Sequence, residues 1–207
     1  MKLTVTTFVT LDGVYQAPGG PQEDPSGGFV HGGWSAPYGD EDFGRFMTGV
    51  FEHAEAFLLG RKTYEIFASY WPLHADPADP IASSLNVLPK YVATTTLASA
   101  DWQNTHLITG DLREEIVALK QRDGKELQVH GSGALVRWLL REGLIDTLHL
   151  LSFPVLLGTG KRLFPTDALP TAYALTQSRT TSAGVVLSSY ERSGEPEYGD
   201  YAEDERV

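Results

Sequence analysis

The amino-acid sequence predicts a single α/β domain with a mostly parallel central sheet, helices on both faces, and an antiparallel pair of strands at one edge. Three observations predict this class. Apolar, β-branched segments alternate with amphipathic helical segments, two strand-to-helix junctions are rich in glycine, and the last two strand-like segments are separated only by a short turn. The length of 207 residues, without a Pro- or Ser-rich linker, fits one domain.

The first half of the chain predicts two strand-to-helix units. A β-branched strand at residues 3–9 ends at Leu11-Asp12-Gly13, and a loop rich in glycine and proline spans 16–39, which suits a mobile flap or a plain surface insertion. Residues 40–53 place apolar side chains at helical spacing behind acidic residues, which predicts an amphipathic helix. A buried strand at 56–59 then leads into a second helix, which ends near Trp71-Pro72 because proline disfavours the helical conformation before it.

The second half continues the alternation. A loop is expected at 73–88, followed by short strands at 90–94 and 106–109. Asp111 and Glu114 have the spacing of a capping box, and Gly143 ends the helix that follows the strand at 126–130. After an apolar strand at 148–155, segments 173–179 and 185–191 form the closing hairpin. We therefore expect one domain over residues 1–192 and an acidic, disordered tail over 193–207.

Composition excludes several classes of function. A net charge of −11 and a pI near 4.9 argue against a nucleic-acid-binding or anionic-membrane surface, and the absence of cysteine excludes a disulfide framework, a thiolate zinc site and a cysteine nucleophile. No segment approaches the roughly 18 apolar residues of a membrane span. The six histidines have no pair at metal-ligand spacing, so we expect no metal site. These features predict a soluble, cytoplasmic protein.

Both glycine-rich junctions have the features of an anion site. Gly60-Arg61-Lys62-Thr63-Tyr64-Glu65 follows an apolar strand, so that a helix N-terminus with free N–H groups lies beside two cations and a hydroxyl. Gly131-Ser132-Gly133 follows a second strand in the same way. Since ligands of such sheets bind at the carboxyl ends of the strands, the two junctions together predict a ligand with several phosphates. Each junction alone is equally well read as an ordinary connection with solvated side chains.

Two common phosphate-binding motifs are excluded. The classical dinucleotide fingerprint needs a third glycine where this chain has the bulky Val136. A Walker A motif around Gly158-Thr159-Gly160-Lys161 fails because Arg162 follows the lysine and Val155 takes the place of the first glycine.

The order of the motifs is more specific than any one of them. Along the chain come Leu11-Asp12-Gly13, an acidic amphipathic helix, the junction at 60–65, Thr94-Thr95-Thr96, His130-Gly131-Ser132-Gly133, and the run 154–164 of sequence PVLLGTGKRLF. Over residues 2–192 this order resembles the dihydrofolate reductase superfamily, and more closely the reductase domain of the bifunctional riboflavin-biosynthesis deaminase/reductase. The resemblance implies a dihydrofolate reductase-like three-layer sandwich, NADPH as the cofactor, and a homodimer.

The resemblance also implies which residues bind the cofactor. Arg61, Lys62 and Thr63 would lie at the adenosine phosphates, with Arg61 reading the 2′-phosphate, which agrees with the match between a guanidinium fork and a phosphate. The remaining candidates contribute hydroxyls, close backbone approach to the pyrophosphate, or position beside the turn: Gly60, Thr94, Thr95, His130, Gly131, Ser132, Gly133, Ala134 and Leu135. Ala134 replaces the cation that is common in true dihydrofolate reductases, so fewer charges would contact the cofactor.

The catalytic acid is sought among the carboxylates of the first helix, where folate reductases hold theirs. Asp42 is chosen because it lies one turn before Phe46, whereas Glu41 points to solvent and Asp40 is the natural N-cap. Asp12 is the alternative, and a role as turn aspartate or helix-dipole partner explains either residue equally well.

The expected function is an NADPH-dependent reductase that transfers hydride to a small heteroaromatic substrate, pterin-like or aminopyrimidine-like. A non-catalytic nucleotide- or flavin-binding dimer and a genuine dihydrofolate reductase remain the alternatives.

Overall fold

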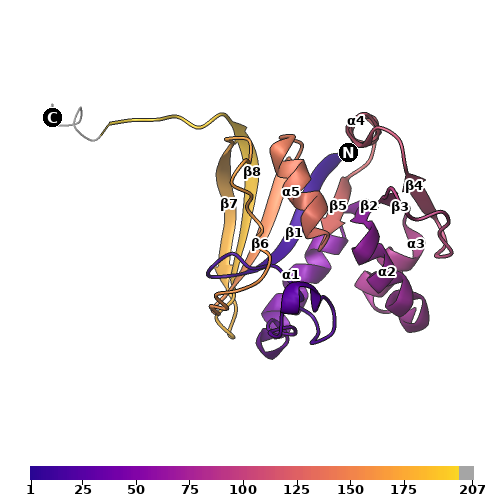
Figure 1. The fold of residues 1–207 in the computed structure, drawn as a ribbon, viewed down its shortest axis with the longest axis horizontal. Helices are drawn as coiled ribbons and strands as arrows, with labels where there is room; N and C mark the ends of the chain where they lie inside the picture. Colours follow the sequence, from indigo (N-terminus) through magenta and orange to yellow (C-terminus); the bar gives the residue numbers. More distant parts are fainter. Residues whose placement is uncertain (201–207) are drawn as a thin grey trace.

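The computed structural model describes residues 1–200, which form one eight-stranded sheet in the order β4-β3-β2-β5-β1-β6-β8-β7. Strands β1 to β6 pair in parallel, and the hairpin β7–β8 joins β6 in antiparallel fashion at one edge (Figure 1). The predicted class is confirmed. The strands are β1 (Lys2–Thr10), β2 (Ala54–Gly60), β3 (Lys90–Ala93), β4 (Thr105–Ile108), β5 (Glu126–His130), β6 (Thr147–Phe153), β7 (Ala172–Thr180) and β8 (Val186–Gly194).

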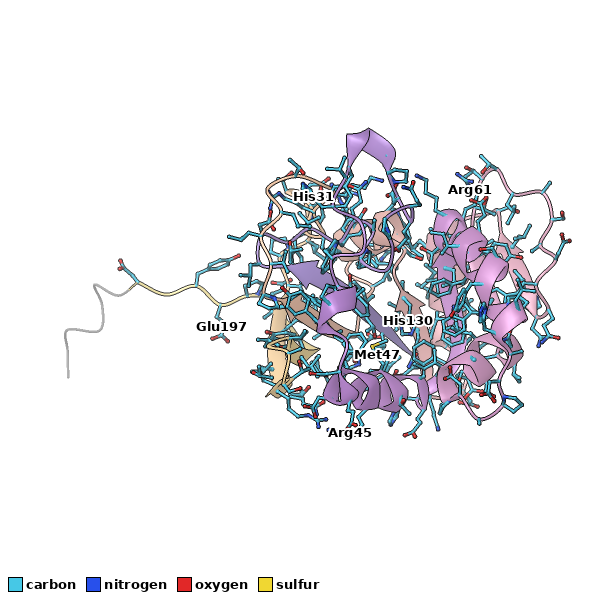
Figure 2. All side chains as sticks on the ribbon, turned by 90° about the horizontal axis from the view of Figure 1, so that it is seen from below. His31, Arg45, Met47, Arg61, His130 and Glu197 are labelled. Carbon is cyan, nitrogen blue, oxygen red and sulfur yellow. The ribbon has the colours of Figure 1, made fainter. Side chains whose placement is uncertain are left out.

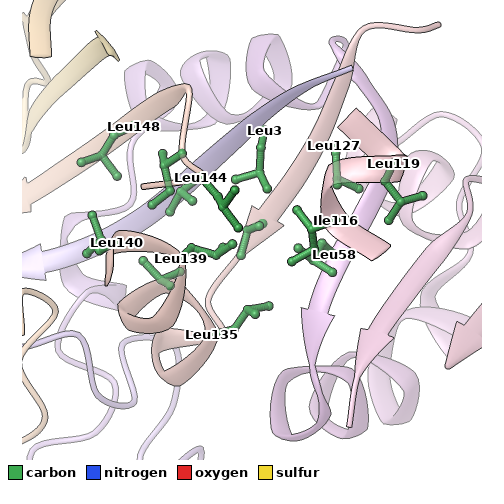
Figure 3. Packing of buried hydrophobic residues seen from close by; sticks show 14 of the residues in the cluster. Leu3, Leu58, Ile116, Leu119, Leu127, Leu135, Leu139, Leu140, Leu144 and Leu148 are labelled. Carbon is green, nitrogen blue, oxygen red and sulfur yellow. The ribbon is translucent and has the colours of Figure 1, made fainter. Parts of the chain in front are cut away.

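Helices cover both faces of the sheet. One face packs against α1 (Glu41–Phe51), α2 (Arg61–Tyr70) and α3 (Pro80–Val87), and the other against α4 (Leu112–Lys120) and α5 (Gly133–Arg141). Alternation along the central strand β1 divides its side chains between the two cores, since Leu3 and Val5 lie with α4 and α5 while Phe8 lies with α1. Figure 3 shows the α4–α5 core, in which Leu3, Leu58 and Leu127 are fully buried. The result is a three-layer sandwich.

The segment 73–88 differs from the prediction of a loop. It contains the end of a 3₁₀ turn, η3 (Trp71–His74), and the helix α3. Asp79 caps α3 by accepting hydrogen bonds from the N–H groups of Ile81 and Ala82, and Pro80 occupies the first turn, where its missing N–H is no loss. The helix forms because it buries Ala82 and Leu85 against the α1 side of the sheet.

Several local predictions are confirmed. Asp111 accepts a hydrogen bond from Glu114 N at 2.9 Å, and Gly143 takes the left-handed conformation (φ +62°) after α5. The hairpin forms as predicted, but β8 continues to Gly194, two residues beyond the expected end of the domain. Of the predicted tail, residues 201–207 lie outside the described residues. Between residues 1 and 200, the structure contains no helix of the length and apolar character that crossing a membrane requires.

Candidate functional site

A cavity of about 1940 Å³ lies along the carboxyl ends of the parallel strands. Its walls come from β1, β2, β3 and β5, from α1, α2 and α5, and from the loop that follows β1. Every residue predicted to contact a cofactor lines it: Gly60, Arg61, Lys62, Thr63, Thr94, Thr95, His130, Gly131, Ser132, Gly133, Ala134 and Leu135. The structure thus brings together residues from three separate parts of the sequence.

The two glycine-rich junctions are bonded directly to each other. The backbone N–H of Gly60 donates to Ser132 Oγ at 3.0 Å, and the N–H of Ser132 donates to Thr63 Oγ1 at 2.9 Å. Gly131 and Ser132 both adopt the left-handed conformation (φ +59° and +51°), which turns the chain from β5 into α5 within two residues. The N-termini of α2 and α5 are therefore held side by side.

These two helices differ from the others at their N-termini. Asp40, Asp79 and Asp111 cap α1, α3 and α4 with their side chains, whereas Gly60 and Ser132, at the starts of α2 and α5, make no side-chain cap bond among the described residues. First-turn N–H groups without a cap are left to bind water or a ligand, and the helix dipole favours an anion there. Among the described residues, two adjacent helix N-termini without side-chain caps therefore lie at the cavity.

Cations lie on both sides of these N-termini. The guanidinium of Arg61 donates to Glu65 at 2.8 and 3.0 Å, while Lys62 is exposed at the cavity edge. Sequence reasoning missed Arg137 and Arg141, which reach the cavity from α5. Their spacing of four residues could have identified a common helix face. Arg137 Nε is buried without a hydrogen-bond partner in the part of the chain that is described. Burial raises the pKa of Tyr15, and the positive charge of Arg137 partly opposes this shift.

The two threonines after β3 differ in environment. Thr94 is buried, and its hydroxyl accepts hydrogen bonds from the N–H groups of Thr96 and Leu97 at 3.2 and 2.9 Å. Thr95 is exposed at the cavity edge. The hydroxyl of Thr94 therefore shapes the turn, and Thr95 is the better placed of the two to contact a ligand.

The first part of the loop 16–39, between residues 16 and 26, lines the cavity and is anchored at several points. Lys161 Nζ donates to Asp24 Oδ2 at 2.5 Å and to Ser26 Oγ at 2.7 Å, and the buried Gln16 accepts from Lys161 N and donates to the carbonyls of Asp24 and Ser26. Two short 3₁₀ turns, η1 (Ser26–Gly28) and η2 (Ala36–Tyr38), add local order. The segment therefore lies beside the site, as expected of a flap rather than of a plain surface insertion, and Lys161 anchors it.

Tyr15, which immediately precedes this loop, packs on the glycine turn. A Cβ atom at Gly133 would lie 1.9 Å from Tyr15 Cε2, far inside any possible contact. Glycine is needed at position 133 because the Tyr15 ring covers it. The ring therefore lies over the N-terminus of α5.

Neither predicted catalytic carboxylate lines the cavity. Asp42 pairs with Arg45 one turn further along α1, and 43% of its side chain is exposed. Figure 2 shows Arg45 on the outer side of α1, whereas Met47 and His130 lie near the centre of the molecule. Asp40 caps α1 as expected and also accepts from Ser182 Oγ and Ala183 N; with the bond from Phe43 N as the largest cause, these bonds lower its pKa to about 2.

Asp12 has a structural environment. Its carboxylate accepts from Thr10 Oγ1 at 2.6 Å and from the N–H groups of Leu157 and Gly158, and its pKa is lowered chiefly by the Thr10 bond. Leu11-Asp12-Gly13 is thereby docked onto the run 154–164, which also presents Lys161 to the loop wall. The two motifs lie side by side because Asp12 of the first accepts hydrogen bonds from Leu157 and Gly158 of the second.

Three other carboxylates do line the cavity, namely Glu23, Asp24 and Glu65. Asp24 and Glu65 are paired with Lys161 and Arg61. Glu23 accepts from the N–H groups of Gly19 and Gly20 at 2.6 and 3.2 Å, yet burial, the largest cause, raises its pKa. Sequence analysis missed Glu23 because it lies in a loop without periodicity.

His130 lies at the inner end of the cavity. It is 6% exposed, stacks on Phe51 with ring centroids 4.4 Å apart, and contacts Gln128 Oε1 through Nε2 at 3.0 Å. Burial, and then the neighbouring His149, lower the pKa of His130 to about 3. The ring is therefore neutral at physiological pH.

Comparison with known proteins agrees with this architecture. Residues 1–187 match the family model described as the RibD C-terminal domain. Among curated proteins, the chain is 28% identical over 195 residues to the uncharacterized protein YyaP of Bacillus subtilis (strain 168), covering 93% of this chain and 96% of that protein.

Solved structures show the same fold at low identity. A protein assigned to riboflavin biosynthesis from Shewanella sp. PV-4 has a TM-score of 0.66 and 21% identity, covering 93% of this chain and 99% of its own. A pyrimidine reductase-like protein from Corynebacterium diphtheriae has a TM-score of 0.61 and 16% identity over 94% and 92% of the two chains. Dihydrofolate reductase from Enterococcus faecalis, solved with NADP(H), has a TM-score of 0.57 and 15% identity over 92% and 96%. The predicted dihydrofolate reductase-like fold is confirmed.

Proposed function

Since the chain belongs to the RibD C-terminal domain family, whose fold is of the reductase type, we propose that it is an NADPH-dependent reductase acting on a pterin-like or aminopyrimidine-like substrate. One observation carries the proposal. The uncapped N-termini of α2 and α5 are bonded to each other at the cavity, next to Arg61 and Lys62. A dinucleotide with three phosphate groups has the charge distribution that this arrangement favours.

The donor set fits that cofactor. Gly131 and the first-turn N–H groups of α5 would bind the pyrophosphate, and Arg61 with Lys62 would bind the 2′-phosphate. For this, the guanidinium of Arg61 must exchange its present contact with Glu65 for the phosphate. The cofactor supplies the hydride when bound, and the protein holds the two reactants in contact and excludes water.

A proton must also reach the substrate. We assign its delivery to Glu23, because this carboxyl lines the cavity, has no cationic partner among the described residues, and is biased toward the protonated form by burial. Asp42 remains the alternative from the first helix, although it lies outside the lining.

Titration of the purified protein with NADPH, followed by nicotinamide fluorescence, tests the cofactor assignment. We expect saturable binding at micromolar concentrations. Absence of binding at high micromolar NADPH would contradict the proposal. NADPH oxidation in the presence of dihydrofolate, compared with 5-amino-6-(5-phosphoribosylamino)uracil, then separates a folate reductase from a riboflavin-type enzyme.

A second candidate is a non-catalytic nucleotide- or flavin-binding protein with the same fold. It is favoured by the position of Asp42 and Asp12, since neither carboxylate chosen from the sequence lines the cavity. NADPH binding without NADPH oxidation in the presence of either substrate would support it. The homodimer and the cytoplasmic location stay predictions.

A further inference from the structure

The inner end of the cavity contains a histidine whose tautomer can be read from its neighbours. Gln128 is fully buried, and its Nε2 donates to Val50 O at 2.6 Å and to Glu126 Oε2 at 2.7 Å. Both partners are acceptors, so the amide orientation is determined, and Oε1 must face His130 Nε2 at 3.0 Å. An amide oxygen only accepts hydrogen bonds. His130 therefore carries its proton on Nε2.

The other ring nitrogen is left as an acceptor. In a neutral imidazole with Nε2 protonated, Nδ1 bears a lone pair. Nδ1 has no hydrogen-bond partner within residues 1–200, and His130 is one of the residues that line the cavity. Of the charged or titratable neighbours, His149 on β6 lowers the proton affinity of the ring, and Glu126 on β5 acts through Gln128.

The surroundings of His130 suit a flat ring. Phe8, Phe43, Met47 and Phe51 also line the cavity, and Phe51 holds the imidazole by stacking. Thr6, whose Cα is the register partner of His130 in the sheet, is 2% exposed, and its hydroxyl also has no partner in the described part of the chain. Buried polar groups are normally satisfied, so Thr6 Oγ1 and His130 Nδ1 are two positions at this cavity that are open to a polar group of a ligand.

We propose that His130 is a specificity-determining residue, whose Nδ1 accepts a hydrogen bond from an N–H group at the edge of a flat heteroaromatic substrate. Gln128 is its positioning residue, because it determines which nitrogen is free. That this ring is a substrate rests on the proposed reductase function, but its recognition by His130 involves no cofactor. Rings whose edge nitrogens are alkylated are selected against, because they leave the Nδ1 acceptor unpaired.

Lumazine and 1,3-dimethyllumazine provide a matched pair of probes, because N-methylation removes both N–H donors from the same bicyclic ring. Calorimetric titration should show that lumazine binds about tenfold more tightly than the dimethyl compound, as expected for one hydrogen bond to a buried acceptor. The preference should disappear in His130→Leu and persist in part in His130→Asn, whose side-chain oxygen can lie near the position of Nδ1. If the methyl groups act by bulk alone, the preference will remain in His130→Leu, and this result would overturn the proposal.

A measurement on the wild type does not depend on any variant folding. Long-range ¹H–¹⁵N spectra should assign the Nε2–H tautomer to His130 and show a shift of Nδ1 when lumazine is added. An Nδ1–H tautomer, or no binding of lumazine at all, would contradict the inference. NADPH binding is measured on the same sample. If NADPH does not bind while the His130 signals are as expected, the reductase function is refuted but the recognition site is not. If NADPH binds and the His130 signals do not respond to lumazine, only the recognition site is refuted.

Discussion

The hydroxyl of Thr63 accepts a hydrogen bond from the backbone N–H of Ser132 at 2.9 Å, and this contact joins two turns that are 69 residues apart in the chain. The reciprocal bond from Gly60 N to Ser132 Oγ makes the connection two-sided. The sequence predicts a phosphate contact for Thr63 and close backbone approach to the pyrophosphate at Ser132. In the structure the two hydroxyls hold the N-termini of α2 and α5 side by side.

Thr63→Val should therefore weaken both folding and cofactor binding. The variant keeps the shape of the side chain but leaves the partly buried N–H of Ser132 without its acceptor, which we expect to cost about 1–2 kcal/mol in the free energy of unfolding. Urea denaturation and NADPH titration measure the two effects. Thr63→Ser retains the hydroxyl and is the control; equal losses in both variants would show that packing, not the hydrogen bond, is responsible.

Arg61 should determine the preference for NADPH over NADH. Arg61→Ala removes a charge-assisted contact to the 2′-phosphate, so NADPH affinity should fall by about 10- to 100-fold while NADH affinity changes little. Glu65→Gln is the complementary variant, because it releases Arg61 from its ion pair and should raise NADPH affinity. Equal losses for both cofactors in Arg61→Ala would mean that Arg61 does not read the 2′-phosphate.

The order of elements and the meeting of the two glycine-rich junctions at one cavity could be predicted because they depend on local patterns. Apolar strands, glycine turns and a capping aspartate such as Asp111 are all visible within a few residues. The helix α3 was missed although Asp79-Pro80 is a start signal, since its apolar positions gain their meaning only from burial against the sheet.

The carboxylates show the limit of helical spacing. Asp42 was chosen by its distance from Phe46, but the spacing does not specify which part of a helix faces a cavity and which faces Arg45. Glu23, Tyr15 and Lys161 come to the site through tertiary contacts of loops, for which a single sequence has no period to read.

Gly133→Ala should destabilise the protein through Tyr15. The added methyl group would overlap the tyrosine ring at 1.9 Å, so the ring or the turn must move, at a cost of about 1–3 kcal/mol. The double variant Gly133→Ala with Tyr15→Ala should recover much of this loss, which a double-mutant cycle in urea would measure as a favourable coupling. Gly49→Ala, where no atom lies within 4 Å of the new methyl group, is the control and should be neutral or stabilising. Additive effects at 133 and 15 would contradict the packing explanation.

Acidification should destabilise the fold through the partly buried His149. Burial, the largest cause, lowers the pKa of His149 to about 4, so the unfolded chain binds more protons than the folded chain between pH 6.5 and pH 4. This stability is present above pH 6.5 and is lost as the pH falls toward 4. The wild type should lose about 2 kcal/mol more than His149→Asn between pH 7 and pH 5. Urea denaturation at both pH values measures the difference; His106→Gln, at an exposed position, should behave like the wild type. Parallel curves for the wild type and His149→Asn would show that His149 is not responsible.

The proton donor is tested by comparing Glu23→Gln with Asp42→Asn. Gln at position 23 retains an oxygen for the N–H groups of Gly19 and Gly20 but has no acidic proton, so the rate of NADPH oxidation should fall by about 100-fold or more while NADPH affinity is retained. Asp42→Asn alters a surface ion pair with Arg45 and should change the rate by no more than about twofold. Both rates are measured with the substrate that the wild type turns over. The opposite result, a large loss in Asp42→Asn with Glu23→Gln unaffected, would return the catalytic role to the first helix and require α1 to present Asp42 to the cavity when ligands bind.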